Sequence, residues 1–174
     1  MGAWGAIIMG FFGAVFAALT MHWQWHAAGL PLTIPFTVFA AIALAAAHVI
    51  RLPGTGIVPS ERARRAIMWS SIAEGIGLFL AANIVINLHR PDLLLPAMAL
   101  VVGLHFLPIA FAATFRPFCV LGAALILSAI VGLIAPAPLG GALAGLTSAL
   151  GLWTAAIIAV RRDWRAKRGV GVTI

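Results

Sequence analysis

The chain has 174 residues, of which 63% are hydrophobic and 9% are charged, and its mean hydropathy is +1.12. A soluble globular protein carries about 25% charged residues, so long segments here lack the residues needed for a polar surface. This composition excludes a soluble globular protein and indicates an integral membrane protein. The net charge of +7 comes from short basic clusters between apolar runs, a pattern that indicates membrane topology and argues against nucleic-acid binding.

Six apolar segments are long enough to cross a bilayer, which takes about 20 residues in a helix. We expect these helices at residues 2–21, 32–50, 66–88, 93–113, 118–135 and 139–160. Trp23 and Trp25 follow the first segment and are typical of the headgroup level, and Ser60 is suited to cap the third helix. The predicted fold is an all-α bundle of six transmembrane helices that forms one domain over residues 1–174.

The fifth and sixth segments share one uncharged run of 44 residues, from Pro117 to Val160. We place their boundary at Pro136 and Pro138, because proline seldom continues a helix. The tail 161–174 is basic and is expected to lie on the membrane surface. The chain has one cysteine, Cys119, so a disulfide within the chain is excluded.

Six crossings place both termini, the loop 51–65 and the turn near Arg116 on one side of the membrane. That side holds ten of the eleven lysines and arginines, all except Arg90. The positive-inside rule makes it the cytoplasm, so the predicted topology is N-in/C-in, with the loop 51–65 and the tail cytoplasmic. The alanine-rich, lysine-poor composition is typical of GC-rich bacteria, which predicts a multi-pass protein of the bacterial inner (plasma) membrane.

Glu74 is the one carboxylate placed well inside an apolar segment, and His105 lies at a similar depth in the next segment. A carboxylate at that depth costs about 2.5 kcal/mol or more, so it is expected to face the bundle interior, to be protonated or to have a partner. Ser70, Gly77 and Ala81 share its helix face. A Glu74–His105 pair would hold one proton between two sites, as proton-linked transport requires, or would simply fix helix packing. The residues alone also leave open that the two side chains make no contact.

Two further pairs of residues are spaced four apart. Asn83 and Asn87 lie on another face of the third segment, where they would line a polar path or bond between helices. Gly141 and Gly145 form a GxxxG motif, whose expected use is close helix packing within the bundle or across a homo-oligomer. The expected partners are therefore the lipid bilayer and, through Gly141/Gly145, a second copy of the chain.

Three histidines are expected near the outer side of the membrane: His22, His26 and His89. They are weak candidates for a metal or haem site, because interfacial histidine is commonly just solvated, and we predict no cofactor. An inner pair of His48 and His105 would be mismatched in depth by about 7 Å. No hydrolase, nucleotide-binding or zinc motif is present, so no catalytic residues are predicted.

These observations favour a small permease or proton-linked channel, with Glu74 as the protonatable group, His105 as its partner and Ser70, Asn83 and Asn87 as polar lining. Two alternatives stay open from the residues alone. One is a membrane redox protein that binds haem or quinone through the histidines. The other is a non-catalytic membrane subunit or regulator that presents its basic loop and tail to a cytoplasmic partner.

Overall fold

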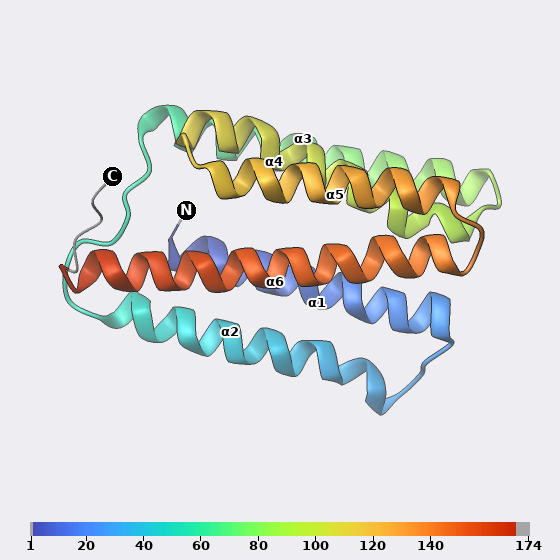
Figure 1. Cartoon of the computed structure of the whole chain (residues 1–174), viewed down its shortest axis with the longest axis horizontal. Coiled ribbons are helices and arrows are strands. Elements are labelled where there is room, and N and C mark those ends of the chain that lie inside the picture. The colour runs from blue at the N-terminus through green and yellow to red at the C-terminus, as the bar shows by residue number, and fades with distance from the viewer. Residues whose placement is uncertain (1, 170–174) are drawn as a thin grey trace.

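The computed structural model describes residues 2–169, which contain helices and no strand. Its six α-helices are α1 (Ala3–Trp25), α2 (Ile34–Arg51), α3 (Glu61–Asn87), α4 (Leu94–Ala113), α5 (Arg116–Ile134) and α6 (Leu139–Lys167) (Figure 1). Two short 3₁₀ helices, η1 (Leu30–Thr33) and η2 (Pro91–Leu93), lead into α2 and α4. All six α-helices are long and apolar enough to cross a membrane, so the predicted all-α fold with six such helices is confirmed.

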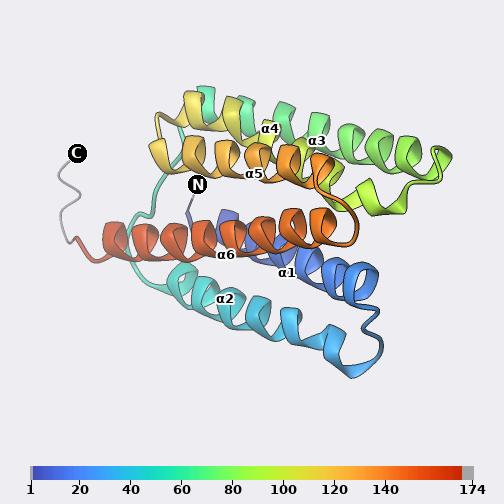
Figure 2. The ribbon, with the colours of Figure 1, turned by 45° about the vertical axis from the view of Figure 1, so that its right-hand side comes forward.

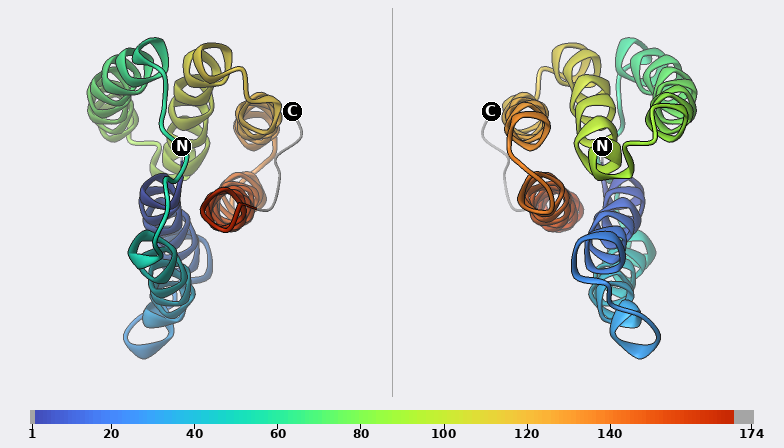
Figure 3. Two further views of the ribbon diagram at one scale, coloured as in Figure 1. Left: turned by 90° about the vertical axis from the view of Figure 1, so that its left-hand side faces the viewer. Right: turned by 90° about the vertical axis from the view of Figure 1, so that its right-hand side faces the viewer.

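Four helices form the centre of the bundle, and two lie outside it. α6 packs against α1, α5 and α4, while α2 packs mainly on α1 and α3 packs on α4. The end-on views show α2 and α3 at opposite extremes of the cross-section (Figure 3), and the turned view shows α1 and α6 side by side (Figure 2). The helices that contribute least buried surface are therefore α2 and α3, the second of which carries Glu74.

Both described ends of the chain lie at the same end of the bundle (Figure 1). The segment 52–60 that joins α2 to α3 and the junction between α4 and α5 lie there too. This end, called the basic end below, carries ten of the eleven lysines and arginines: Arg51, Arg62, Arg64, Arg65, Arg116, Arg161, Arg162, Arg165, Lys167 and Arg168.

The core combines a few large side chains with many small ones. Phe16, Phe118, Leu125 and Leu152 are almost fully buried. Small residues let helix backbones approach closely, as is usual in membrane bundles. A Cβ atom on Gly103 of α4 would lie 3.0 Å from the Gly122 carbonyl oxygen of α5, so the contact between these helices needs glycine.

Three helices extend further than the apolar segments predict. α1 continues past residue 21 to Trp25 at the end opposite the basic end, and α3 and α6 extend at the basic end. α3 begins at Glu61, where the Ser60 hydroxyl accepts a hydrogen bond from the Ala63 amide at 3.2 Å. Residues 161–167 continue α6, so the expected tail is helical up to Lys167. At 1.5 Å per residue the 29 residues of α6 span about 44 Å, more than the roughly 30 Å of a bilayer's hydrocarbon core. Hydropathy marks the apolar part of a helix, whereas charged residues with good helix propensity carry the helix beyond it.

Candidate functional site

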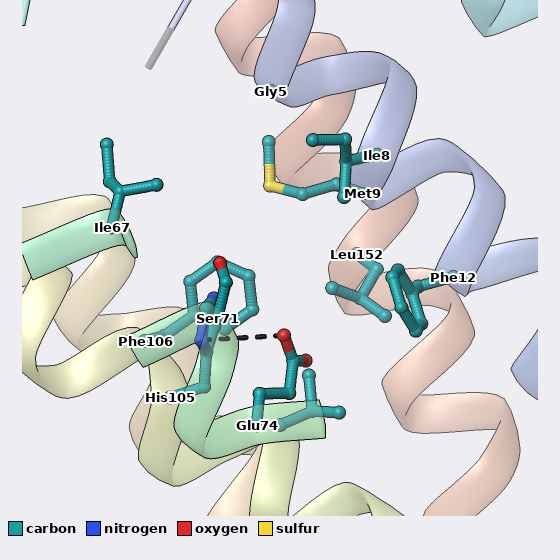
Figure 4. Close-up of a pocket in the computed structure, with 11 residues that line it drawn as sticks. Gly5, Ile8, Met9, Phe12, Ile67, Ser71, Glu74, His105, Phe106 and Leu152 are labelled. Atoms are coloured by element: carbon teal, nitrogen blue, oxygen red, sulfur yellow. Dashed lines mark ion pairs between the residues drawn. The ribbon is translucent and has the colours of Figure 1, made fainter. Parts of the chain in front are cut away.

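The structure brings Glu74 of α3 and His105 of α4 together. The Glu74 Oε2 atom lies 3.5 Å from His105 Nδ1, and the two side chains are 13% and 7% exposed (Figure 4). Nδ1 of His105 is buried and has no hydrogen-bond partner. The pair is thus close enough to form an ion pair when the imidazole is protonated. Nδ1 nevertheless lacks a hydrogen-bond partner, and a buried polar atom without one is costly.

Small residues on α3 set this contact. Ser70 is buried, and a Cβ on Gly77 would lie 2.9 Å from a methyl carbon of Val101 on α4. Residues 70, 74, 77 and 81 therefore form the face of α3 that packs on α4, as their spacing predicts. Close approach of the two helices brings the Glu74 carboxylate within reach of the imidazole.

A cavity of about 60 Å³ adjoins the pair, between α3, α4, the first half of α1 and Leu152 of α6. Its polar lining consists of Glu74, His105 and Ser71, and its apolar lining includes Met9 and Phe12 (Figure 4). Since one water needs about 10–15 Å³ measured in this way, the cavity has room for a few waters. Its size suits a proton or a small hydrated ion better than a metabolite.

A larger cleft of about 440 Å³ lies toward the basic end and shares Gly5, Ile8 and Ile67 with the cavity. Its polar lining is Asp163 and Lys167, both from the extended part of α6. Ile67 precedes Glu74 by seven residues on α3, or about 10 Å along the helix. The cleft and the cavity therefore lie in succession between the basic end and the Glu74–His105 pair.

Asp163 and Lys167 hold the chain together around this cleft. The buried Asp163 carboxylate accepts hydrogen bonds from the amide of Ala3 at 3.0 Å and from the amide of Ile57 at 2.8 Å. Lys167 Nζ donates to the carbonyl oxygens of Ile50 and Leu52 at 2.8 and 3.0 Å. Two residues of the predicted surface tail thus fix the start of α1, the end of α2 and the segment after it.

Asn83 and Asn87 lie away from the site. Both are exposed on the outer face of α3, half a turn around the helix from Glu74. Asn83 donates to the Phe79 carbonyl oxygen at 2.7 Å, and Asn87 donates to the Asn83 carbonyl oxygen at 2.9 Å. Each amide thus satisfies its own helix backbone. The predicted bonds from these residues to another helix are not formed, and within the chain the pair does not line the cavity.

The three histidines that the sequence places on the outer side lie at helix ends. His26 and His89 follow α1 and α3 in left-handed conformations, and His22 Nδ1 lies 3.2 Å from the Ala27 carbonyl oxygen. His48 is exposed on α2, apart from His105 on α4. Within residues 2–169 no group of three or more histidine, cysteine, aspartate or glutamate side chains is arranged to hold a metal.

The GxxxG glycines pack against α1 of the same chain. A methyl group on Gly145 would overlap the Thr20 hydroxyl, and one on Gly141 would lie 2.5 Å from the side-chain nitrogen of Gln24. Thr20 and Gln24 are buried by this contact. In this structure the motif serves helix packing within one chain, which is the first of the two uses that the sequence left open.

Comparison of the chain with protein-family models, with curated proteins and with solved structures finds no match. The geometry of the site is therefore the basis for the proposed function. Sequence reasoning missed Ser71 and Asp163 as lining residues. The position of Ser71 next to the predicted Ser70–Glu74 face was a weak signal for it. Asp163 is the one acidic residue in a basic segment, and this feature could have marked it as a lining residue.

Proposed function

We propose that this chain is a multi-pass protein of the plasma membrane, with both ends cytoplasmic, and that it acts as a proton-linked permease or channel. Glu74 is the group that binds and releases the proton, and His105 is its partner. The observation that carries this proposal is the mostly buried Glu74–His105 contact at 3.5 Å beside a small cavity. Ionisable residues inside membrane segments are costly, and they commonly mark proton or ion pathways.

The chemistry of the pair supports proton exchange. When one proton is shared, it resides on the carboxylate or on the imidazole, and the two forms differ in where the charge lies. Nδ1 of His105 has no hydrogen-bond partner in the structure, so a proton bound there would have no competing acceptor and could move toward Glu74 or toward water in the cavity. A pair used only for packing would gain more from a short, fully satisfied hydrogen bond.

The cleft at the basic end supports a direction for access. It leads toward the cavity through shared residues and is lined by Asp163 and Lys167. On the other side of the pair, α1 and α4 pack on α6 around buried residues such as Phe16 and Leu95. We therefore propose that Glu74 exchanges protons with the cytoplasm in this conformation.

Proton flux into liposomes tests the function. Purified protein is reconstituted with a pH-sensitive dye inside, and a potassium gradient with valinomycin supplies the driving force. We expect the wild type to acidify the lumen well above empty liposomes and Glu74→Gln to lower this flux at least tenfold. The matched control is Glu61→Gln, because Glu61 is exposed and pairs with Arg64 at 3.0 Å. Equal flux in Glu74→Gln and the wild type would refute the role of Glu74, and wild-type flux no higher than that of empty liposomes would refute the function.

Reporter fusions test the membrane topology separately. Fusions placed after Arg168 and in the segment 52–60 are expected to report the cytoplasm, and a fusion after Arg90 is expected to report the outside. The positive-inside rule carries this expectation, because Arg90 is the one lysine or arginine away from the basic end. A fusion after Arg168 that reports the outside would overturn the topology and, with it, the cytoplasmic access route.

A further inference from the structure

An open groove runs between α5 and α6 on the surface away from the Glu74 site. Its volume is about 610 Å³, and its walls are almost wholly apolar: Val120, Leu121 and Ala124 from α5, with Leu150, Gly151 and Ile158 from α6. Val120 and Leu150 are 69% and 60% exposed. Within a bilayer, an apolar groove this open accommodates a lipid acyl chain.

The basic end of this groove carries positive charge. Arg116, the first residue of α5, lines it beside Phe115. The guanidinium carbon of Arg162 on α6 lies 4.2 Å from the centre of the Phe115 ring. This cation–π contact, which holds a guanidinium over an aromatic face, places a second arginine next to the same end of the groove.

Within residues 2–169 no side-chain carboxylate pairs with these arginines. The chain has four acidic residues, and each is engaged elsewhere. Glu61 pairs with Arg64, Asp92 with Arg90 and Glu74 with His105. The fourth, Asp163, accepts hydrogen bonds from two backbone amides. Within residues 2–169 the positive charge at the mouth of the groove is thus unmatched, and an anionic group of another molecule would complement it.

We propose that the groove between α5 and α6 binds an anionic phospholipid, with one acyl chain along the apolar walls and the phosphate between Arg116 and Arg162. Arginine recognises phosphate through paired N–H donors, and basic pockets between helices on the cytoplasmic side suit anionic headgroups. A second copy of the chain fits less well, because its own basic end would bring like charge to the same place. The proposal rests on membrane insertion, which is part of the proposed function, but it does not depend on proton flux.

Native mass spectrometry of the detergent-purified protein tests this site. The protein is titrated with dioleoyl phosphatidylglycerol and, in parallel, with dioleoyl phosphatidylcholine, which has the same chains and no net charge. An arginine near a headgroup contributes roughly a fivefold change in affinity. We therefore expect the wild type to bind its first phosphatidylglycerol about 25-fold more tightly than phosphatidylcholine. Arg116→Gln/Arg162→Gln should bring the two affinities within about threefold of each other.

Two matched controls separate the site from general charge and hydrophobicity. Arg62→Gln/Arg65→Gln removes the same charge from exposed positions of α3 at the basic end and should keep the preference. Ala124→Trp fills the groove and should weaken both lipids, whereas Ala123→Trp adds the same bulk at an exposed position that does not line it and should weaken neither. Circular dichroism confirms that each variant is folded.

Four results would overturn the proposal. One is equal binding of the two lipids by the wild type, and a second is a preference that survives loss of both arginines. A third is displacement of the bound lipid by inorganic phosphate at equal concentration, which would assign the arginines to a free anion. The fourth is a dimer that Ala124→Trp abolishes, which would assign the groove to a second copy. If the chain stayed monodisperse without detergent, membrane insertion itself would fail, and this outcome is distinguishable from the other four.

Discussion

Replacing the buried Asp163 by alanine is expected to destabilise the basic end of the bundle strongly. The residue is 6% exposed, and its two carboxylate oxygens accept backbone hydrogen bonds of 3.0 and 2.8 Å from Ala3 and Ile57. Hydrogen bonds to a charged group contribute about 1.5–3 kcal/mol each. Alanine would leave two amides without acceptors, although it would also remove a buried charge that is costly in itself. We therefore expect a net loss of about 3 kcal/mol in the free energy of unfolding.

Denaturant titration in detergent micelles, followed by circular dichroism, measures this loss. Asp163→Asn keeps one carbonyl acceptor and should lose about half as much stability as Asp163→Ala, on the order of 1.5 kcal/mol. The matched control is Asp92→Asn, because Asp92 forms a partly exposed pair with Arg90 and such pairs contribute at most about 1 kcal/mol. Hydrogen exchange should show faster exchange at the Ala3 and Ile57 amides. A loss below 1 kcal/mol in Asp163→Ala, with both amides still protected, would refute the reasoning.

Three further predictions follow from the packing and from the residues outside the site. Gly145→Ala should lower the free energy of unfolding by about 1–3 kcal/mol, because the added methyl group overlaps Thr20. In a double-mutant cycle, adding Thr20→Ala should recover part of this loss. If the two changes were simply additive, the contact between Gly145 and Thr20 would be contradicted. Asn83→Leu/Asn87→Leu should leave proton flux in liposomes within about twofold of the wild type, because both amides bond to their own helix; a tenfold fall would make them part of the pathway. The oxidised and reduced absorption spectra of the purified protein should lack a Soret band, and a band lost in His22→Ala would favour the redox alternative.

Hydropathy predicts the six helices because a membrane span must satisfy every backbone group within one apolar segment. Hydropathy therefore predicts the apolar part of each helix and does not predict how far the helix continues beyond it. Glu61 and the residues after Val160 therefore lay outside the expected helices, although they continue α3 and α6. Helix propensity, and not hydropathy, decides these extensions, and it is a weaker signal in a short charged segment.

The Glu74–His105 contact could be anticipated because both residues lie on neighbouring antiparallel helices at matched depth. Depth along a helix follows from counting residues, whereas the direction of a side chain around the bundle depends on which helices are neighbours. Asn83 and Asn87 illustrate the limit. Their spacing indicates a shared polar face, but α3 lies outside α4, so that face points away from the rest of the chain.

The contacts of Asp163 could not be predicted from sequence, because Ala3 lies 160 residues away from it. Such a contact depends on how α1 and α6 align, and a local sequence pattern does not predict that alignment. The segment between α2 and α3 also depends on contact with α6, through two of its glycines. Gly54 has a φ of +105°, and a Cβ on Gly56 would lie 2.6 Å from an Asp163 oxygen. Both glycines are needed because this segment runs directly against α6.

Asp163 and Lys167 lie one helical turn apart on α6 and act on opposite helix ends. The carboxylate meets the amino end of α1, where the helix dipole is positive, and the ammonium group meets the carbonyl end of α2, where it is negative. A single turn of α6 therefore stabilises α1 and α2 through complementary charge, and it also forms the polar lining of the cleft that leads toward Glu74. Because the same two residues hold the helices and line the cleft, loosening this turn should change access to Glu74 as well as stability. The flux of Asp163→Ala, measured beside that of Asp163→Asn, would show whether the two properties are coupled.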